Sequence, residues 1–474
     1  MKADLDSARV QCLAGFGMAD RADVYLFRPT SEDEVRAALM TARRTGRQVV
    51  LRGAGQSYGD AALLPEAAAL DLGRMNQIRS WDPERGVIEA DAGVTIEQVW
   101  RHALEDGWWP PVVSGTMRPT LAGALSANIH GKNNYCMGVL GDHVERIRIM
   151  WADGNVEDIT SEDPKFRVVV SGMGLFGVIL RLRLRLKRVT CGDLRVLPIS
   201  VRSWGEQFAA FAKYESSADY LVSWVDAFAK GSSAGRGLIH AAWYPDDIVD
   251  PHSLLARHQD LPDTILGTIP KSRVWKYLKA LNRPAFIRWI NASKYLSSKK
   301  LGDDKPHLQS IVGFSFLLDY VPNWRRAYEP DGLLQFQVFT PKEHAQHVFE
   351  ELLEMQHRGG MPAFLAVMKR HRPDRYLLSH GVDGYSLALD FKIKNRHQRQ
   401  LVSLCHEMAR FAVKYGSRFY FAKDRVLTPE LTRAFLGDER LQEFRDWKAQ
   451  LDPENLFSSA LAKRVGLDPD GASD

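Results

Sequence analysis

The sequence predicts an α+β protein of two domains. The chain has 474 residues, 45% of them hydrophobic, and a single core rarely grows beyond roughly 250 to 300 residues. Helix caps, strand-like runs and glycine loops follow one another up to about residue 189, whereas longer helices and strands follow from about Leu197. We expect a first domain over 1–195, an α+β domain over 196–415, and a C-terminal stretch over 416–474 that composition alone assigns to neither.

Local sequence patterns predict the elements of the first domain. Ser31 and Glu34 form a capping-box pattern, which predicts a helix running towards Gly46. The apolar run 48–52 predicts a buried strand that opens into the glycine-rich loop 53–60.

Further along the first domain, strands are expected at 68–72 and 86–93, followed by a second capped helix from Thr95. A hairpin is expected to turn at Asp153 and Gly154. Strict alternation of apolar and polar residues from Val178 predicts a half-buried strand.

Composition argues against several classes of function. Lys and Arg number 63 against 58 Asp and Glu, and the excess of +5 is too small for the basic face of a nucleic-acid-binding protein. The four cysteines lie far apart and match neither a disulfide framework nor a zinc site. Residues 1–20 do not resemble a signal peptide, and no window reaches the roughly 18 apolar residues of a membrane span. We expect a cytoplasmic protein.

Residues 172–177 match G-x-G-x-x-G, the fingerprint of a dinucleotide-binding βαβ unit. That interpretation requires a helix after the third glycine, whereas the residues from Val178 alternate as a strand does. We expect 166–171 to be a strand as well, so the glycines form a turn between strands that can still touch a cofactor.

The loop 53–60 suits a phosphate group for a different reason. Successive backbone amides after a strand can form a concave anion site, and Gly53 and Gly55 remove side-chain bulk there. An ordinary surface turn is the alternative. A second stretch of small residues, 112–134, suggests that both segments contact one extended ligand, for which a dinucleotide is the natural candidate.

His344 and His347 lie one helical turn apart, a spacing that a metal can use. No H-E-x-x-H order or nearby cysteine accompanies them, so an exposed helix face is the favoured interpretation. No metal is expected.

Four segments together resemble the FAD-linked oxidases of the vanillyl-alcohol-oxidase type: VVLRGAGQSYGDAALLP, GTMRPTLAGALSANIHGKNN, LFGVILR and FYFAKD. The resemblance spans about residues 25–465 and is greatest to the oxidases of polyprenyl-phosphate ribose. It implies a PCMH-type FAD-binding fold built from both ends of the chain, with the α+β substrate domain inserted between them. Residues 416–474 would then complete the FAD-binding domain.

The resemblance also implies roles for matched positions. The residues expected to bind FAD are Arg52, Gly53, Ala54, Gly55, Gln56, Ser57, Tyr58, Gly59, Asp60, Ala61, Gly115, Thr120, Leu121, Ala122, Gly123, Ala127, Asn128, Ile129, His130, Ile179 and Tyr420. Those expected to face the substrate are Tyr58, Lys132, Gln335, Gln337 and the catalytic candidate Lys423.

Oxidation of an alcohol requires a hydride acceptor and a group that deals with the hydroxyl proton. Lys423 is the candidate, either as a base with a lowered pKa or as a cation that stabilises negative charge on the flavin; without the resemblance, a solvated lysine is the simpler interpretation. Lys132 is expected to bind a phosphate and Tyr58 to stack on or hydrogen-bond to the sugar. Gln335 and Gln337 share one strand face, either in a sugar pocket or on a polar surface. His130 is expected near the flavin without a role in proton transfer.

Two positions depart from the family pattern. Some members attach FAD covalently through a histidine, where this chain has Gln56, so non-covalent FAD is expected. Ala388 occupies the position of a cysteine beside the flavin in the polyprenyl-ribose oxidases, which puts an identical choice of substrate in doubt.

Residues 271–300 contain many Lys and Arg, no Asp or Glu, and five interspersed aromatic residues. Such a segment is typical of a surface that lies on an anionic membrane, at the cytoplasmic face in this case. A helical hairpin that packs its aromatics onto the substrate domain is the alternative.

These observations predict an FAD-dependent oxidoreductase that oxidises a sugar hydroxyl, namely the 2-hydroxyl of a polyprenyl-phosphate ribose, to a ketone. In the resembling family a short-chain reductase partner then reduces the ketone, which completes an epimerisation in cell-wall polysaccharide biosynthesis. The alternatives are an alditol or aldonolactone oxidase acting on free sugars, and a flavin-free protein that binds a sugar or a lipid phosphate.

Overall fold

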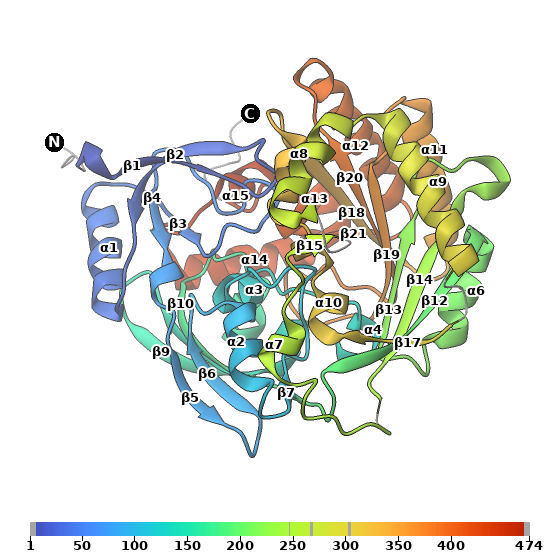
Figure 1. Cartoon of the computed structure of the whole chain (residues 1–474). Helices are drawn as coiled ribbons and strands as arrows, with labels where there is room; N and C mark the ends of the chain where they lie inside the picture. Colours follow the sequence, from blue (N-terminus) through green and yellow to red (C-terminus); the bar gives the residue numbers. More distant parts are fainter. Residues whose placement is uncertain (1–5, 246, 266–268, 302–304, 469–474) are drawn as a thin grey trace.

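The chain forms two lobes that lie side by side, with the C-terminal helices returning to the first lobe (Figure 1). The computed structural model describes residues 6–245, 247–265, 269–301 and 305–468. The outermost residues of the predicted domains, 1–5 and 469–474, lie outside these ranges.

The first lobe contains two sheets. The four-stranded sheet has the order β1 (Val10–Ala14), β2 (Arg21–Phe27), β4 (Ala68–Asp71), β3 (Val49–Arg52). The five-stranded sheet has the order β5 (Ile78–Asp82), β6 (Val87–Asp91), β10 (Val178–Arg185), β8 (Val144–Met150), β9 (Val156–Thr160). The helices of the first lobe before residue 190 are α1 (Glu32–Arg44), α2 (Ile96–Ala103), α3 (Leu121–Ser126), α4 (Asn134–Met137) and α5 (Pro164–Val169).

The two predicted capping boxes differ in detail. Thr95 and Gln98 exchange both reciprocal hydrogen bonds at the start of α2, as predicted. At α1, Ser31 Oγ accepts from the Glu34 amide at 3.3 Å, but the Glu34 carboxylate accepts from the Thr30 amide instead. The helix begins where predicted, although its second cap bond comes from one residue earlier.

One element of the first lobe was predicted wrongly. Residues 164–169 form the helix α5 rather than a strand, because Asp163 caps it through the Lys165 amide and Pro164 occupies its first turn. The glycine turn at 172–177 therefore joins a helix to the strand β10. The absence of a helix after Gly177 agrees with the rejection of the dinucleotide fingerprint.

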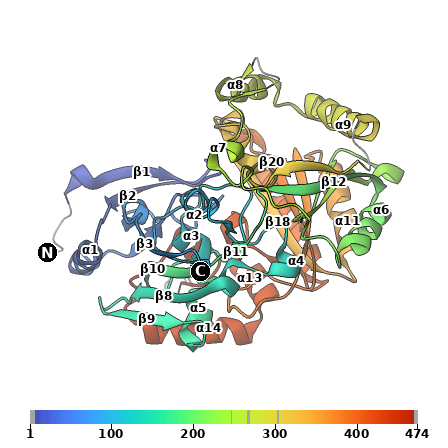
Figure 2. The same ribbon diagram turned by 60° about the horizontal axis from the view of Figure 1, so that its bottom comes forward.

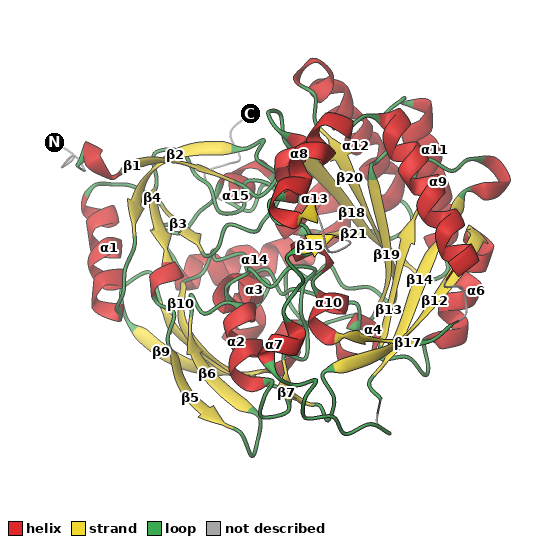
Figure 3. Ribbon diagram, in the orientation of Figure 1, coloured by secondary structure: helices red, strands yellow, loops and turns green. Residues whose placement is uncertain are grey.

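The second lobe is built on an eight-stranded sheet. Its order is β17 (His307–Ser310), β12 (Asp193–Ser203), β14 (Gly235–Trp243), β13 (Tyr220–Val225), β19 (Leu365–His371), β20 (Gly384–Lys392), β18 (Leu333–Pro341), β21 (Arg418–Phe419). The helices α6 (Trp204–Tyr214), α11 (Ala345–Arg358) and α12 (Gln398–Val413) pack on one face of this sheet (Figure 3). The opposite face is turned towards the first lobe.

The remaining short elements connect these layers. They are β7 (Trp108–Trp109), β11 (Lys187–Arg188), β15 (Thr264–Ile265), β16 (Ile269–Pro270), α7 (Ala256–Gln259) and α10 (Ile311–Ser315). The C-terminal helices are α13 (Pro429–Leu436), α14 (Asp438–Leu451) and α15 (Ala460–Arg464).

The end of the chain joins the first lobe through backbone hydrogen bonds. The Val49 amide donates to Leu456 O at 2.7 Å, and the Ser458 amide donates to Val49 O at 3.0 Å. The half-buried carboxylate of Asp60 accepts from Arg464 on α15. In chain order, the sheet of the second lobe begins with β12 at Asp193 and ends with β21 at Phe419. The chain therefore returns to the first lobe a few residues after the expected boundary at 415/416.

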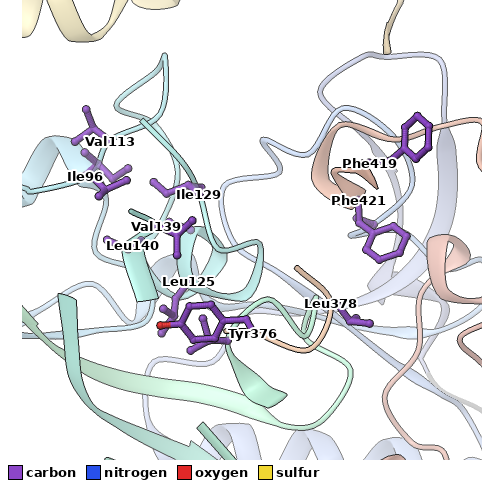
Figure 4. Close-up of a cluster of buried hydrophobic side chains, with 14 of the residues drawn as sticks. Ile96, Val113, Leu125, Ile129, Val139, Leu140, Tyr376, Leu378, Phe419 and Phe421 are labelled. Atoms are coloured by element: carbon purple, nitrogen blue, oxygen red, sulfur yellow. The ribbon is translucent and has the colours of Figure 1, made fainter. Parts of the chain in front are cut away.

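The largest of the buried apolar clusters in the described chain runs through both lobes. Figure 4 shows Ile96, Val113, Leu125 and Ile129 of the first lobe in this cluster. The loop between β19 and β20 adds Tyr376 and Leu378, and Ser171 Oγ donates to Leu378 O at 3.1 Å. This loop therefore anchors the second lobe against the first.

Residues 271–301 form a pair of helices, α8 (Lys271–Leu281) and α9 (Pro284–Leu301), on the outside of the second lobe (Figure 2). α8 packs against the short helix η6 (Trp324–Tyr328), and α9 packs against β12 and β14. None of the helices in the described ranges is long and apolar enough to span a bilayer.

Candidate active site

A cavity of about 540 Å³ lies between the two lobes. Loop 52–58 and the small-residue stretch 113–130 form one side, and the open face of the eight-stranded sheet forms the other. Both segments that the sequence assigned to one extended ligand therefore meet at one cavity.

The loop after β3 is an anion cradle. None of the backbone N–H groups of residues 53–57 donates a hydrogen bond to another described residue. Gly55 has φ +63°, and a Cβ on Gly53 would lie 2.1 Å from Thr120 Oγ1. Arg52 Nη1 is also buried without a partner in the described chain. Unclaimed amides and a guanidinium nitrogen beside a cavity fit the pyrophosphate of FAD.

The wall that would carry the flavin is made of small residues. Thr120 caps α3 by accepting from the Gly123 amide at 3.3 Å, which brings Ala122 and Gly123 to the cavity. The glycine turn before β10 adds Met173 and Gly174. Backbone and small side chains can lie close to a flat ring system there.

Most predicted cofactor residues line the cavity. These are Arg52, Gly53, Ala54, Gly55, Gln56, Ser57, Tyr58, Ala61, Gly115, Thr120, Ala122, Gly123, Ala127, Ile129, His130, Ile179 and Tyr420.

Four predicted cofactor residues lie behind this lining, where each has a structural contact. Leu121 is part of the core, and Asn128 Oδ1 accepts from the Gly141 amide. Asp60 binds Arg464, and a Cβ on Gly59 would lie 2.2 Å from Asp424 O.

In the eight-stranded sheet, the register of β18, β20 and β19 places polar residues of these three strands side by side. Gln335 pairs with Asp390, and Gln337 pairs with Ala388. In the neighbouring pair of strands, Lys369 lies opposite Ser386. All of these residues line the cavity, because side chains two apart on a strand share a face. The predicted substrate residues Gln335 and Gln337 thus face the cavity rather than solvent, and Ala388 lies beside Gln337.

Several cations face the cavity, and Asp390 is the only carboxylate among its described lining residues. Burial and the nearby Lys369 lower the pKa of Lys132 to about 7. Burial alone lowers the pKa of Lys369, and of Lys294 on α9, to about 8. Lys132 Nζ donates to the Phe314 carbonyl, and none of the three lysines has a carboxylate partner in the described chain. Clustered lysines without carboxylates form a site for an anion.

Lys423 ends the one-turn 3₁₀ helix η8 (Phe421–Lys423) and lines the same cavity. Its Nζ lies 3.8 Å from the centroid of the Tyr58 ring. Burial lowers the pKa of Lys423, Asp390 opposes this shift, and burial raises the pKa of Asp390. The Gln335 amide donates to Asp390. The site thus holds an amine whose pKa is lowered by burial close to a carboxyl group whose pKa is raised by burial.

His130 lies in a buried aromatic cluster. Its ring centroid is 5.1 Å from that of Tyr420 and 5.2 Å from that of Phe339. Burial lowers the pKa of His130 well below the ordinary value, so the imidazole is neutral at physiological pH. A neutral, hydrogen-bonded imidazole agrees with its predicted structural character.

Sequence reasoning missed Lys369, Asp390 and Lys294. Asp390 alternates with apolar residues in YSLALDF, so a period of two was available as a signal, whereas Lys369 follows four consecutive apolar residues in LAVMKRH and carries no such signal. Their convergence depends on strand pairing, which the sequence of each strand does not specify. Lys294 reaches the cavity from α9, whose residues were expected either on a membrane surface or in a hairpin that packs its aromatics onto the substrate domain.

His344 and His347 are both exposed, as the favoured interpretation predicted. His344 precedes α11 as its N-cap, and His347 is hydrogen-bonded to the Tyr415 hydroxyl. Within the described ranges, no group of three or more His, Cys, Asp or Glu side chains is arranged to hold a metal ion.

The fold and the cavity together define an FAD-dependent oxidoreductase of two domains. Residues 24–160 match the family model of the FAD binding domain, which covers loop 53–57 (the amide loop) and the α3 part of the small-residue wall. The predicted α+β fold and the FAD cofactor are thereby confirmed.

The chain belongs to the family of oxidases that includes decaprenylphosphoryl-beta-D-ribose oxidase. It is 30% identical to that protein of Mycolicibacterium smegmatis over 453 residues, which cover 92% of this chain and 94% of the relative. The resemblance stated from the sequence motifs is confirmed.

Lactone oxidases are more distant and match less of the chain. A putative D-arabinono-1,4-lactone oxidase of Neurospora crassa is 23% identical over 55% of this chain and 46% of its own length. The L-gulonolactone oxidase of Bos taurus is 25% identical over 34% of this chain and 36% of its own length.

Proposed function

We propose that this oxidoreductase oxidises the 2-hydroxyl of a polyprenyl-phosphate ribose to a ketone. The observation that carries the proposal is the set of lysines 132, 294 and 369, which face the cavity without carboxylate partners. A free polyol or lactone offers no anion to such a site, whereas a sugar phosphate ester does. The name of the Mycolicibacterium relative supports the same substrate class.

The residues that would hold FAD are those of the amide loop and of the small-residue wall. When bound, FAD supplies the acceptor for the hydride that leaves the carbon bearing the hydroxyl. The hydroxyl proton needs a separate acceptor, and Lys423 is our candidate because burial lowers its pKa. In its charged form the same amine would instead stabilise negative charge, which is the second role that the sequence left open.

Polar residues of the eight-stranded sheet would orient the sugar. Gln335 and Gln337 face the cavity from β18, and Tyr58 provides an aromatic surface beside Lys423. Exclusion of water follows from the burial of these side chains: Tyr58 is 4% exposed and Gln337 is 6% exposed. A dry site strengthens each of these interactions.

The test is anaerobic bleaching of the flavin. Purified holoenzyme is mixed with farnesyl-phosphoryl ribose, free ribose, L-gulono-1,4-lactone or arabinitol, and the absorbance of the oxidised flavin is followed. We expect rapid bleaching by the phosphoryl ribose alone. Bleaching by the lactone or the polyol and not by the phosphoryl ribose would establish the alternative of an aldonolactone or alditol oxidase. A purified protein without flavin absorbance would instead support the binding-protein alternative.

A ketone product implies a second enzyme. Reduction of the ketone from the opposite face would invert the carbon, so we propose a short-chain reductase as the functional partner. Incubation with the phosphoryl ribose, an electron acceptor that reoxidises the flavin, and such a reductase plus its nicotinamide cofactor should yield the epimer. The ketone should accumulate when the reductase is omitted.

The proposal includes peripheral contact with the cytoplasmic face of the membrane through 271–300. Tyr277 and Trp289 are 62% and 63% exposed on α8 and α9. The exposed cations Arg273, Lys276, Arg283 and Arg288 form no ion pair with a described residue. Tyr295, in contrast, is buried at 8% exposure, so the hairpin packs some aromatics inward and presents others to solvent. Exposed aromatics among unpaired cations suit anionic headgroups.

Co-sedimentation with vesicles tests this contact. We expect binding to phosphatidylglycerol vesicles at low salt and little binding to phosphatidylcholine vesicles. A Tyr277→Ser/Trp289→Ser variant should remain in the supernatant, whereas Met40→Ser, which removes a residue 65% exposed on α1, should bind normally. Failure of the unmodified protein to sediment removes the membrane contact and leaves the flavin test unaffected.

A further inference from the structure

Three buried side chains form a hydrogen-bonded chain that begins at the cavity. Gln337 Nε2 lies 3.2 Å from His130 Nε2, and His130 Nδ1 lies 3.0 Å from His380 Nε2. His380 belongs to the loop that anchors the second lobe to the first, and it is only 2% exposed. Its Nδ1 is buried without a partner in the described chain.

The protonation of this chain is restricted by burial. Desolvation lowers the pKa of His130 well below its ordinary value and lowers that of His380 to about 3. Both imidazoles are therefore neutral at physiological pH, and a neutral imidazole has one donor and one acceptor nitrogen. Fixing the tautomer of one ring fixes that of the other, because one nitrogen of each contact must donate and the other must accept.

The direction of the hydrogen bonds follows from the Gln337 amide. Its nitrogen faces His130, so it donates to His130 Nε2. His130 then carries its proton on Nδ1 and donates to His380 Nε2. The Gln337 carbonyl oxygen makes no hydrogen bond to a described residue, and the side chain lines the cavity. The opposite set of tautomers would turn the amide and present its nitrogen to the cavity.

We infer that His380 is a positioning residue that, through His130, holds the Gln337 amide with its carbonyl oxygen towards the substrate. An acceptor at that place selects an alcohol, which donates a hydrogen bond, over a ketone, which only accepts one. This inference rests on the proposed function for the identity of the ligand. The hydrogen-bond chain itself is a property of the protein and can be tested without any substrate.

A neighbouring histidine provides a matched control. His371 is equally buried, at 1% exposure, and its ring centroid lies 5.0 Å from that of His130. It is hydrogen-bonded to Asn134 Oδ1 and Ser386 Oγ rather than to His130. Replacement of His371 therefore removes a buried imidazole from the same cluster without breaking the chain to Gln337.

The first test measures the tautomer of His130 by ¹⁵N NMR of histidine-labelled holoenzyme, with the signal assigned by its loss in His130→Gln. We expect the proton on Nδ1 in the unmodified protein and in His371→Phe. In His380→Phe the acceptor for this proton is lost, so we expect a mixture of tautomers. A proton on Nε2 in the unmodified protein, or an unchanged tautomer in His380→Phe, overturns the inference whatever the substrate is.

The second test measures the dissociation constants of phosphoryl ribose and of its 2-deoxy analogue by perturbation of the flavin spectrum. Loss of one hydrogen bond should weaken binding of the hydroxyl compound about tenfold in His380→Phe and leave the 2-deoxy analogue unchanged. His371→Phe should leave the ratio of the two dissociation constants as it is in the unmodified protein. His380→Gln, whose amide oxygen can again accept from His130, should bring the ratio part of the way back from its value in His380→Phe. Equal weakening of both ligands overturns the inference. If neither ligand binds the unmodified protein, the proposed function fails and the NMR result alone decides the role of His380.

Discussion

Lys423 Nζ lies 3.8 Å from the centroid of the Tyr58 ring, although the two residues are far apart in the sequence. The Tyr58 amide donates to Ala422 O at 2.9 Å, which fixes this approach through the backbone. The amide loop and the turn η8 are thereby joined at the place where the substrate would meet the flavin. Residues from both ends of the chain therefore meet at this part of the cavity.

We expect Lys423→Ala to reduce turnover of the phosphoryl ribose by about 10²-fold or more, the usual contribution of a positioned proton acceptor. FAD content should be unchanged because the amide loop remains intact. Stopped-flow bleaching measures the rate, and Lys213→Ala on the exposed face of α6 is the control. Full activity in Lys423→Ala would remove the residue from the mechanism.

Lys369 should contribute to binding of the phosphate rather than to chemistry. Lys369→Met is expected to raise KM for the phosphoryl ribose about tenfold and to change kcat little, since a charge-assisted hydrogen bond is lost in both ground and transition states. Because burial lowers the pKa of Lys369 to about 8, the charged form is lost as pH rises through 8. KM of the unmodified enzyme should therefore rise above that pH, and this rise should be weaker in the variant.

Sequence reasoning located the cofactor segments better than the substrate segments. Loop 53–60 and the stretch 112–134 are local patterns, because glycine and other small residues specify close backbone approach within a few positions. Gln335 and Gln337 were correctly assigned to one strand face, because the period of a strand is local too. Lys369, Asp390 and His380 were missed because their positions depend on the register of β19 against β20 and on an anchoring loop. Neither feature is encoded within a single segment.

The buried histidines should make stability depend on pH. The folded-state pKa of His380 is about 3, below the value of about 6.5 in an unfolded chain. The unfolded state therefore binds an extra proton between these values, and stability is full above pH 6.5 and falls as the pH is lowered from there. At pH 5 His380 alone should cost about 2 kcal/mol relative to pH 7. Denaturant unfolding of His380→Phe should show a shallower loss between pH 6.5 and 5, and an identical pH profile would contradict the shift.

FAD should be released on denaturation. Gln56 occupies the position where some relatives of this family carry a linking histidine, and its amide nitrogen donates instead to Ala54 O at 3.0 Å. After precipitation with trichloroacetic acid, the yellow colour should remain in the supernatant. Colour in the pellet would indicate a covalent bond to another residue of the site.

The amide loop itself can be tested at Gly53. A Cβ there would lie 2.1 Å from Thr120 Oγ1, the oxygen that caps α3, so Gly53→Ala must displace either the loop or the cap. Loss of an N-cap costs about 1 kcal/mol, and movement of the loop would also misplace its free amides. We expect about tenfold weaker FAD binding, measured by fluorescence after reconstitution of the apoprotein. Gly205→Ala is the matched control, because a Cβ at Gly205 in α6 would come no closer than 3.9 Å to Ser203 Oγ. Unchanged FAD affinity in Gly53→Ala would show that the contact between the loop and Thr120 does not shape the cofactor site.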